Sequence, residues 1–400
     1  MRPPAVSRRS LLLGSAAATA AVALPHAQPA SAQSSASASN GAGQEAVPFH
    51  GLHQAGVETP LQAHGVFIGL DLARNVGKAD LARLMKVWTG DAERLTKGQP
   101  ALADTEPELA VVPARLTATI GFGPGVFQRS GLRGQKPDWL QPLPEFAIDR
   151  LKPEYTGADL LLQLAADDPI TLAHAQRMMI KDAAGFAQVR WAQRGFHRAA
   201  AHTETGATGR NLMGQLDGTV NPQPETGQFD ELVWISDGAP AWLAGGTGMV
   251  LRRIRMKLDD WDALSRPEKE MAMGRRLDTG APLTGSAETD LPDFAAKHNN
   301  GFDVIPETAH VRAAAGSVNR VQFLRRPFNY DDGFLPNGNP DLGLLFAAYA
   351  ANLETQFTPV QRRLAKVDLL NLWTVPIGSA VFAIPPGCDS GGFIGETLLS

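Results

Sequence analysis

Three short stretches of the sequence combine residue types that could carry out chemistry, and the first surrounds Asp217. It spans residues 214–222 (GQLDGTVNP), where two glycines and a proline indicate a loop instead of a helix or strand. Such a loop can hold the Asp217 carboxylate at a fixed point and let the backbone approach a flat ligand closely. Taken alone, the Asp217-Gly218 pair is more typical of an ordinary turn.

The second stretch, residues 309–312 (AHVR), contains His310, which could bind a metal. Of the other histidines, His26 lies near the N-terminus, and His197 and His202 lie among polar residues typical of turns. The chain has no His-x-x-x-His or Cys-x-x-Cys pair suited to zinc. A histidine that binds a metal alone needs the other ligands from a macrocycle, as in haem proteins with one axial histidine. The simpler interpretation is a surface or core histidine.

The third stretch, residues 320–326 (RVQFLRR), ends in Arg325 and Arg326 after an apolar run. Consecutive residues of a strand face opposite sides, so we expect one arginine to point inward and the other to meet solvent. A solvated pair at the end of a strand remains the alternative.

Together these stretches make the chain resemble the dye-decolourising-type haem peroxidases, in the exported bacterial branch that includes deferrochelatase-like members. The likeness lies in Gly214-x-x-Asp217-Gly218-Thr219, in the segment at His310 and in Leu324-Arg325-Arg326. It extends over nearly the whole chain after the leader, from residues 47–56 (VPFHGLHQAG) to residues 378–387 (GSAVFAIPPG). Pro327, where the family usually has glycine, and Ala315-Gly316, where it usually has an Asn-Pro or His-Pro pair, depart from the pattern.

The resemblance implies a site as well as a fold. It implies haem b (iron protoporphyrin IX), with His310 as axial iron ligand and Asp217 and Arg325 on the opposite side. Gly218, Thr219 and Val220, with Arg325, are the implied haem contacts. The implied substrates are hydrogen peroxide and a bulky electron donor such as a dye or a phenol. The implied fold is two ferredoxin-like halves with antiparallel sheets, of the dimeric α+β barrel type, with haem in the C-terminal half and a homo-oligomer as a further expectation.

An aspartate as the catalytic base has a consequence for pH. An Asp side chain ordinarily has a pKa of about 3.9, against about 6.5 for His, so we expect activity on dyes to be highest near roughly pH 4–5. The imidazole of His310 would be tuned by whatever group accepts its second ring proton. Bulky donors need a route for electrons, and the candidates are Trp373, Tyr330 and Tyr349, although ordinary core positions are the simpler interpretation.

Three other functions remain open. The protein could bind haem and release its iron, as a deferrochelatase-like protein would, with peroxidase activity incidental. It could be a haem enzyme with Cys388 as thiolate ligand, or a secreted binding protein without catalysis.

The composition excludes several classes of protein. The formal charge of −4 provides no global basic field for nucleic acid or an anionic membrane. A single Cys excludes an intramolecular disulfide and any all-thiolate metal site. The length of 400 residues is typical of two domains or one large one.

The N-terminus has the features of a targeting signal. Residues 1–32 contain three arginines and no acidic residue, and they end in a small-residue motif that favours cleavage after Ala32. The pair Arg8-Arg9 resembles a twin-arginine export signal, which predicts the twin-arginine translocase as a partner and a location outside the cytoplasm; an ordinary secretory signal is the alternative. The apolar stretch Leu11 to Leu24 is short for a membrane span. Residues 33–46, rich in Ser, Ala and Gly, predict a disordered tether.

The rest of the chain must supply the elements that position these residues. Alternating apolar residues predict half-buried strands at 66–72, 116–122 and 253–258, and strand-like runs occur at 319–325 and 380–385. Helical periodicity predicts helices at 81–88, 169–184, 267–275 and 353–367. We therefore expect an α+β architecture with antiparallel sheets, divided into halves at 47–215 and 216–400.

Overall fold

The computed structural model describes residues 43–129, 132–198, 208–236, 240–315 and 323–400. The expected leader and most of the expected tether lie outside these ranges, as do His202 and Arg320. All described residues belong to one compact unit.

Nine strands are found in the described residues. They are β1 (His64–Leu72), β2 (Thr117–Phe122), β3 (Leu160–Ala166), β4 (Ala187–Phe196), β5 (Thr247–Met256), β6 (Leu324–Arg325), β7 (Phe328–Phe334), β8 (Pro340–Ala350) and β9 (Thr374–Ile384).

Helices and short turns connect these strands. They are α1 (Lys78–Thr96), α2 (Pro124–Arg129), α3 (Pro169–Asp182), α4 (Gly227–Val233), α5 (Leu258–Asp262), α6 (Arg266–Met273), α7 (His310–Ala315), α8 (Phe357–Val367) and α9 (Glu396–Leu399), with 3-10 turns η1 (Pro107–Leu109), η2 (Arg133–Gln135), η3 (Pro153–Tyr155), η5 (Ala241–Leu243) and η6 (Leu369–Leu372).

The strands form one antiparallel sheet that closes on itself. Their order is β5-β9-β2-β3-β1-β4-β7-β8-β6, and β8 also pairs with β5, so eight of the described strands form a ring. The first half of the chain supplies β1 to β4 and the second half supplies the others. The two sets meet at the single pairs Phe122↔Ala383 and Phe196↔Asn329. The predicted α+β class with antiparallel pairing is confirmed.

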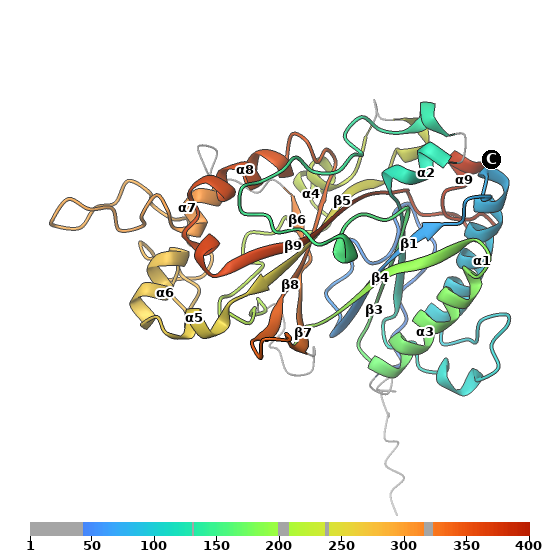
Figure 1. Cartoon of the computed structure of the whole chain (residues 1–400), viewed down its shortest axis with the longest axis horizontal. Coiled ribbons are helices and arrows are strands. Elements are labelled where there is room, and N and C mark those ends of the chain that lie inside the picture. The colour runs from blue at the N-terminus through green and yellow to red at the C-terminus, as the bar shows by residue number, and fades with distance from the viewer. Residues whose placement is uncertain (1–42, 130–131, 199–207, 237–239, 316–322) are drawn as a thin grey trace, which may run out of the picture. The chain divides into compact units, whose positions relative to one another are not determined.

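Helices α1 and α3 cover the outer face of the first set of strands (Figure 1). The apolar face of α1, including Leu84 and Trp88, shares a core with Val66 and Ile68 of β1. Helix α3 begins where Asp168 accepts a hydrogen bond from the Thr171 backbone N–H, with proline in the first turn. The amphipathic patterns read from the sequence therefore mark real contacts between helix and sheet.

The prediction of half-buried strands was wrong for β1 and β2, which are buried on both faces. The outer face lies under the helices, and the inner face lies inside the ring, where Phe67 belongs to a second core. Polar residues on that face do not meet solvent: Thr117 and Thr119 are fully buried and take part in hydrogen bonds with Gln62 and Gln163. Ring closure explains the difference, because it buries a face that an open sheet would expose.

Several predicted boundaries also need correction. Leu258 begins α5 instead of ending a strand, and the helix expected from 353 begins at Phe357. Only Leu324 and Arg325 of the predicted strand at 319–325 are described as strand. Arg253, expected on a polar strand face, is buried and paired with Asp332 and Asp341.

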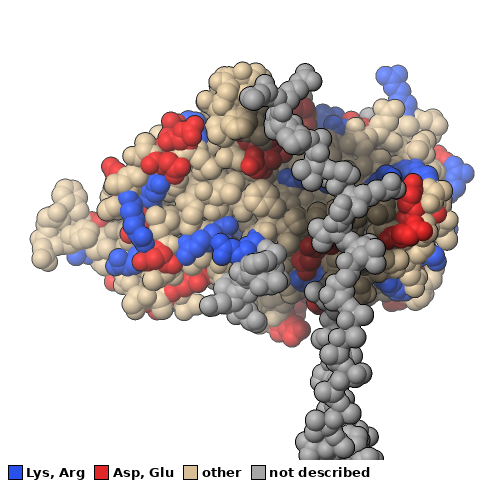
Figure 2. All heavy atoms as spheres, turned by 90° about the horizontal axis from the view of Figure 1, so that it is seen from below, with Lys and Arg blue, Asp and Glu red and all other residues tan. Residues whose placement is uncertain are grey.

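Charges of both signs lie interspersed on the face shown in Figure 2, as expected for a chain with a formal charge of −4. Among the described residues, no helix is long and apolar enough to cross a membrane.

Candidate active site

Asp217 lies on one leg of a hairpin formed by residues 208–219. Arg210 pairs with Leu216 in an antiparallel bridge, and the Asp217 backbone N–H donates to the Gly209 carbonyl at 2.8 Å. Gly214 has a φ of 82°, a left-handed conformation that favours glycine. Backbone pairing therefore fixes the point from which the Asp217 side chain starts.

The structure brings Asp217 and Arg325 together across 108 positions of sequence. Nη1 of Arg325 donates to Oδ1 of Asp217 at 3.0 Å, and the side chains are 21% and 14% exposed. The Asn221 side chain holds the Arg325 backbone from both sides: Oδ1 accepts from the Arg325 N–H at 3.0 Å, and Nδ2 donates to the Arg325 carbonyl at 2.7 Å. The guanidinium thus starts from a fixed backbone and keeps some exposed surface.

His310 is the first residue of α7, and its ring is oriented by Asp368. Nδ1 of His310 lies 2.6 Å from Oδ2 of Asp368, whose side chain is 5% exposed. An ionised carboxylate can only accept, so Nδ1 carries the proton and Nε2 keeps a lone pair available to a metal. The sequence predicted such an acceptor but could not identify it, because Asp368 lies 58 positions away.

A close approach between α6 and α7 places His310. Gly274, at the C-terminal end of α6, has a φ of 84°, and a Cβ there would lie 2.5 Å from Cγ1 of Val311. Any larger residue would push α7 away from α6. Position 274 therefore requires glycine both for its conformation and for packing beside His310.

His310, Asp217 and Arg325 also share one electrostatic environment. Burial lowers the pKa of His310, but Asp368 outweighs this effect through its charge and hydrogen bond, so the pKa is raised overall. The Arg325 charge lowers the same pKa and the Asp217 charge raises it. The three residues selected from the sequence therefore lie near enough to affect one another.

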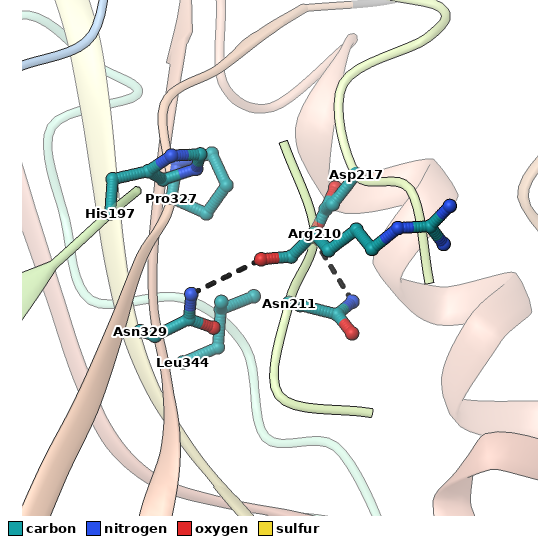
Figure 3. Close-up of a pocket in the computed structure, with 7 residues that line it drawn as sticks. All are labelled: His197, Arg210, Asn211, Asp217, Pro327, Asn329 and Leu344. Carbon is teal, nitrogen blue, oxygen red and sulfur yellow. Dashed lines mark hydrogen bonds between the residues drawn. The ribbon is translucent and has the colours of Figure 1, made fainter. Parts of the chain in front are cut away.

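A small hollow lies beside Asp217, and His197 forms part of its wall (Figure 3). The hollow has no enclosed space for even a water molecule, so it is not the cofactor site. Burial lowers the pKa of His197, while the Asp217 charge opposes that effect. Placing His197 in an ordinary polar turn therefore missed its position, because only the hairpin brings it near Asp217.

Of the two neighbouring arginines, Arg326 is the one that points inward. It is 4% exposed and donates to the Thr59 carbonyl and to the Gln62 side chain. Burial lowers its pKa to about 10. The two arginines face different sides, as expected for neighbours on a strand: Arg326 points into the interior and Arg325 faces Asp217.

The other residues expected at the site differ in their surroundings. Gly218 has a φ of 138°, Thr219 donates to Glu288 at 2.7 Å, and Val220 is 49% exposed. Their predicted contact with haem stays a prediction.

Cys388 lies in different surroundings from His310. Its Sγ is 3.7 Å from Nδ1 of His50, and burial, with nearby carboxylates, raises the pKa of the thiol to about 11. A raised thiol pKa opposes thiolate ligation, which needs the deprotonated form.

The three aromatic candidates for electron transfer differ in exposure. Tyr330 and Tyr349 are fully buried. Trp373 is only partly buried and packs edge-on against Trp261, with ring centroids 5.3 Å apart. Of these three, only Trp373 offers a surface to a bulky donor.

The residues present fit a haem group. The imidazole of His310 has one nitrogen held by a carboxylate and is itself 32% exposed. Leu344 borders the hollow beside Asp217 and also belongs to an apolar cluster with Leu370, two residues after Asp368. In the part of the chain that the structure describes, no group of three or more His, Cys, Asp or Glu residues could hold a bare metal ion. An iron bound by His310 would therefore take its other ligands from a macrocycle, and the apolar side chains nearby suit a porphyrin.

Fold and site together define a class of protein: an α+β barrel in which a partly exposed histidine held by a carboxylate lies within electrostatic reach of an aspartate–arginine pair. The family can be stated more closely. Residues 54–197 match the N-terminal Dyp-type peroxidase model and residues 208–389 match the C-terminal Dyp-type peroxidase model. The chain belongs to the Dyp-type peroxidase family.

Individual relatives agree with this assignment. The chain is 40% identical over 359 residues to the dye-decolorizing peroxidase of Thermobifida fusca, covering 86% of this chain and 83% of the relative. It is 36% identical over 415 residues to the deferrochelatase of Yersinia pseudotuberculosis, covering 98% and 95%.

Solved structures show the same similarity. The crystal structure of a DyP-type peroxidase from Cellulomonas bogoriensis is 52% identical, with a TM-score of 0.87 and coverage of 90% of this chain and 99% of that one. The oxyferrous complex of DtpA from Streptomyces lividans is 41% identical, with a TM-score of 0.86 and coverage of 90% and 99%. The protein is therefore a haem peroxidase, as the sequence predicted.

Proposed function

We propose that the protein uses hydrogen peroxide to oxidise dyes, phenols or other bulky donors, with His310 as axial haem ligand and Asp217 and Arg325 on the peroxide side. The observation that carries the proposal is the 3.0 Å contact between Arg325 and Asp217, within electrostatic reach of His310. The name of the Thermobifida relative supports dyes as the substrate class.

Each of the three residues has a separate task in this proposal. When bound, haem supplies iron that takes two oxidising equivalents from peroxide and passes them on to donors. The Asp217 carboxylate accepts the proton of one peroxide oxygen and delivers it to the other, which leaves as water. The Arg325 guanidinium stabilises the negative charge that develops as the O–O bond breaks. Asp368 holds the Nδ1 proton of His310 and makes the imidazole a stronger donor to iron.

The fold part of the proposal concerns the two halves. We interpret each as ferredoxin-like, with haem in the C-terminal half. The strand orders β4-β1-β3-β2 and β9-β5-β8-β7 support this interpretation, because the two halves pair their strands in the same pattern. His310, Asp368 and Arg325 all come from the second half, which supports the placement of haem.

Stopped-flow absorbance tests the catalytic proposal. Mixing the ferric protein with equimolar peroxide should change the haem spectrum rapidly, and Arg325→Leu should slow that change. Arg133→Leu, on an exposed 3-10 turn of the first half, is the matched control and should react like the wild type. A wild-type spectrum that peroxide leaves unchanged would contradict the proposal.

A second candidate function is release of iron from haem. The Yersinia relative, which matches 98% of this chain, carries the name deferrochelatase. Incubation with haem in the absence of peroxide distinguishes the two. Metal-free porphyrin as product would favour iron release, and unchanged haem would leave the peroxidase as the function.

Export is also proposed on sequence alone. Residues 1–32 would direct the protein through the twin-arginine translocase, and residues 33–42 would form a tether. The expected tether was too long, because the backbone N–H groups of Ala114 and Arg115 donate to the carbonyls of Gly43 and Glu45 and fix this part of the chain. Arg8→Lys with Arg9→Lys should leave the uncleaved protein in the cytoplasm, as fractionation and N-terminal sequencing would show. Continued export would favour the ordinary secretory signal. Self-association is a further proposal, which sedimentation of the full chain would test.

A further inference from the structure

A single carboxylate joins the two legs of the hairpin that carries Asp217. The hydroxyls of Thr208 and Thr219 both donate to Oε1 of Glu288, from Thr219 at 2.7 Å. We propose that Glu288 is a positioning residue that holds Asp217 at its distance from Arg325. This inference rests on the proposed role of Asp217 as proton acceptor and names Glu288 as the residue that keeps Asp217 in place.

The location of this link explains why it acts on Asp217. The Asp217 N–H donates to Gly209, and Thr208 directly precedes Gly209 while Thr219 lies two positions after Asp217. Glu288 therefore ties the hairpin immediately beside the bond that fixes the Asp217 backbone. Without this tie, the two legs can separate at the base.

Glu288 is itself held firmly enough to serve as an anchor. Its backbone carbonyl accepts from Nη1 of Arg275 at 2.8 Å, and Arg275 is only 9% exposed. Asp290 caps the turn that presents Glu288 by accepting from the backbone N–H groups of Ser286 and Ala287 at 2.8 and 2.9 Å. These bonds fix the backbone from which the Glu288 side chain starts, independently of the hairpin.

Packing brings the segment of Glu288 against the hairpin. Gly280 has a φ of 70°, and a Cβ there would lie 2.4 Å from Cδ1 of Leu216 and 3.2 Å from Cγ of Glu288. Only glycine allows this approach, which places Glu288 next to the leg that carries Asp217.

Charge connects the same residues to Arg325. Burial lowers the pKa of Arg275, the Glu288 charge raises it, and the Arg325 charge lowers it. The two guanidiniums are therefore close enough to repel, and Glu288 supplies negative charge beside one of them. Geometry and charge can be separated, because Glu288→Gln keeps an acceptor oxygen and removes the charge.

The test compares Glu288→Ala, Glu288→Gln and the exposed control Glu231→Ala in the haem-loaded protein. Three quantities are measured: the rate constant with peroxide, the rate at which a donor reduces the oxidised enzyme, and the Asp217–Arg325 separation in crystals. We expect Glu288→Ala to lower the peroxide rate constant by about 10- to 100-fold, since small misplacements have effects of this size. Donor reduction should not change, Glu288→Gln should recover most of the rate, and the 3.0 Å separation should increase only in the alanine variant.

Each contrary outcome is informative. A peroxide rate constant and a separation that stay at wild-type values in Glu288→Ala would overturn the inference, as would equal losses in Glu288→Gln and Glu288→Ala. If Glu288→Ala does not fold, Thr208→Val and Thr219→Val each remove one donor and should each give part of the loss. A wild type that does not react with peroxide would refute the proposed function, and the crystallographic separation would then decide the inference by itself.

Discussion

Nδ1 of His310 lies 2.6 Å from Oδ2 of Asp368, and the chain contains a second pair of the same kind that lies elsewhere in the fold. In that pair, Nε2 of His174 lies 2.8 Å from Oδ2 of Asp104, with side chains 1% and 0% exposed. The difference is in access, because the His310 side chain is 32% exposed and the His174 side chain is closed to any ligand. The His174–Asp104 pair therefore supports the structure, whereas the His310–Asp368 pair leaves a ring nitrogen available to a ligand.

This relationship gives the first prediction. Asp368→Asn should raise the midpoint potential of the haem iron and lower the peroxide rate constant by about 10- to 100-fold, because the amide NH2 that would then face the imidazole N–H cannot accept a hydrogen bond. Oδ1 of Asp368 also accepts from the Leu370 N–H, and the asparagine oxygen can keep that bond. Redox titration checks the potential. Asp104→Asn is the matched control, and an equal shift there would contradict the prediction.

The second prediction concerns pH. Aspartate ordinarily loses its proton near pH 3.9, so dye oxidation should be fastest near roughly pH 4–5. Asp217→Asn should lower the peroxide rate constant by about 100-fold or more across this pH range, because the amide cannot take up the peroxide proton. Steady-state rates from pH 3 to pH 9 check this. An optimum above neutrality would show that another group accepts the proton.

The third prediction concerns the electron donor. Trp373 is partly buried beside Trp261 and follows Asp368 by five positions, whereas Tyr330 and Tyr349 are fully buried. Trp373→Phe should lower turnover of a bulky dye several-fold and leave that of a small phenol unchanged. Trp139→Phe, a partly buried tryptophan of the first half, is the control. An equal loss of turnover with both donors would show that Trp373 supports the fold and does not pass electrons to bulky donors.

The fourth prediction concerns stability. Burial, reinforced by the neighbouring Asp91 carboxylate, raises the pKa of Asp182 from 3.8 to about 7. The folded state therefore keeps a proton that the unfolded chain has lost, so its contribution to stability is complete below pH 3.8 and declines as the pH rises to about 7.

Asp182→Asn should accordingly raise Tm at pH 8, by roughly 1 °C for each kcal/mol regained in a chain of this length, and change it little at pH 4. Calorimetry at the two pH values measures the difference. Asp138→Asn removes an exposed carboxylate and should have no such dependence. A gain in Tm that is equal at both pH values would show that Asp182 does not keep a proton in the folded state.

Some features could be read from sequence because their causes are local. The helical period at 81–88, the Pro-initiated α3 and the glycine-rich loop at Asp217 all depend on residues within a few positions of one another. The motifs at Asp217, His310 and Arg325 identified the family, and both family models confirm it.

Other features depended on partners far along the chain. Alternation along β1 and β2 indicated one buried face, but closure of the ring buried the second face as well. The sequence did not show which of Arg325 and Arg326 points inward, and Arg326 lies in the interior with Gln62, 264 positions away. Asn221 lies in the loop of Asp217, whereas Asp368 and Glu288 belong to no motif. The bonds of all three to site residues became visible only in three dimensions.

The sequence by itself determined the family, the cofactor and the candidate residues, because short motifs preserve residue types that chemistry requires. Only the tertiary structure decided which side chains meet: Asp217 with Arg325, His310 with Asp368, and the legs of the Asp217 hairpin with Glu288. The physical reason is that hydrogen bonds act over about 3 Å in space, and folding alone brings positions 58 to 108 residues apart within that distance.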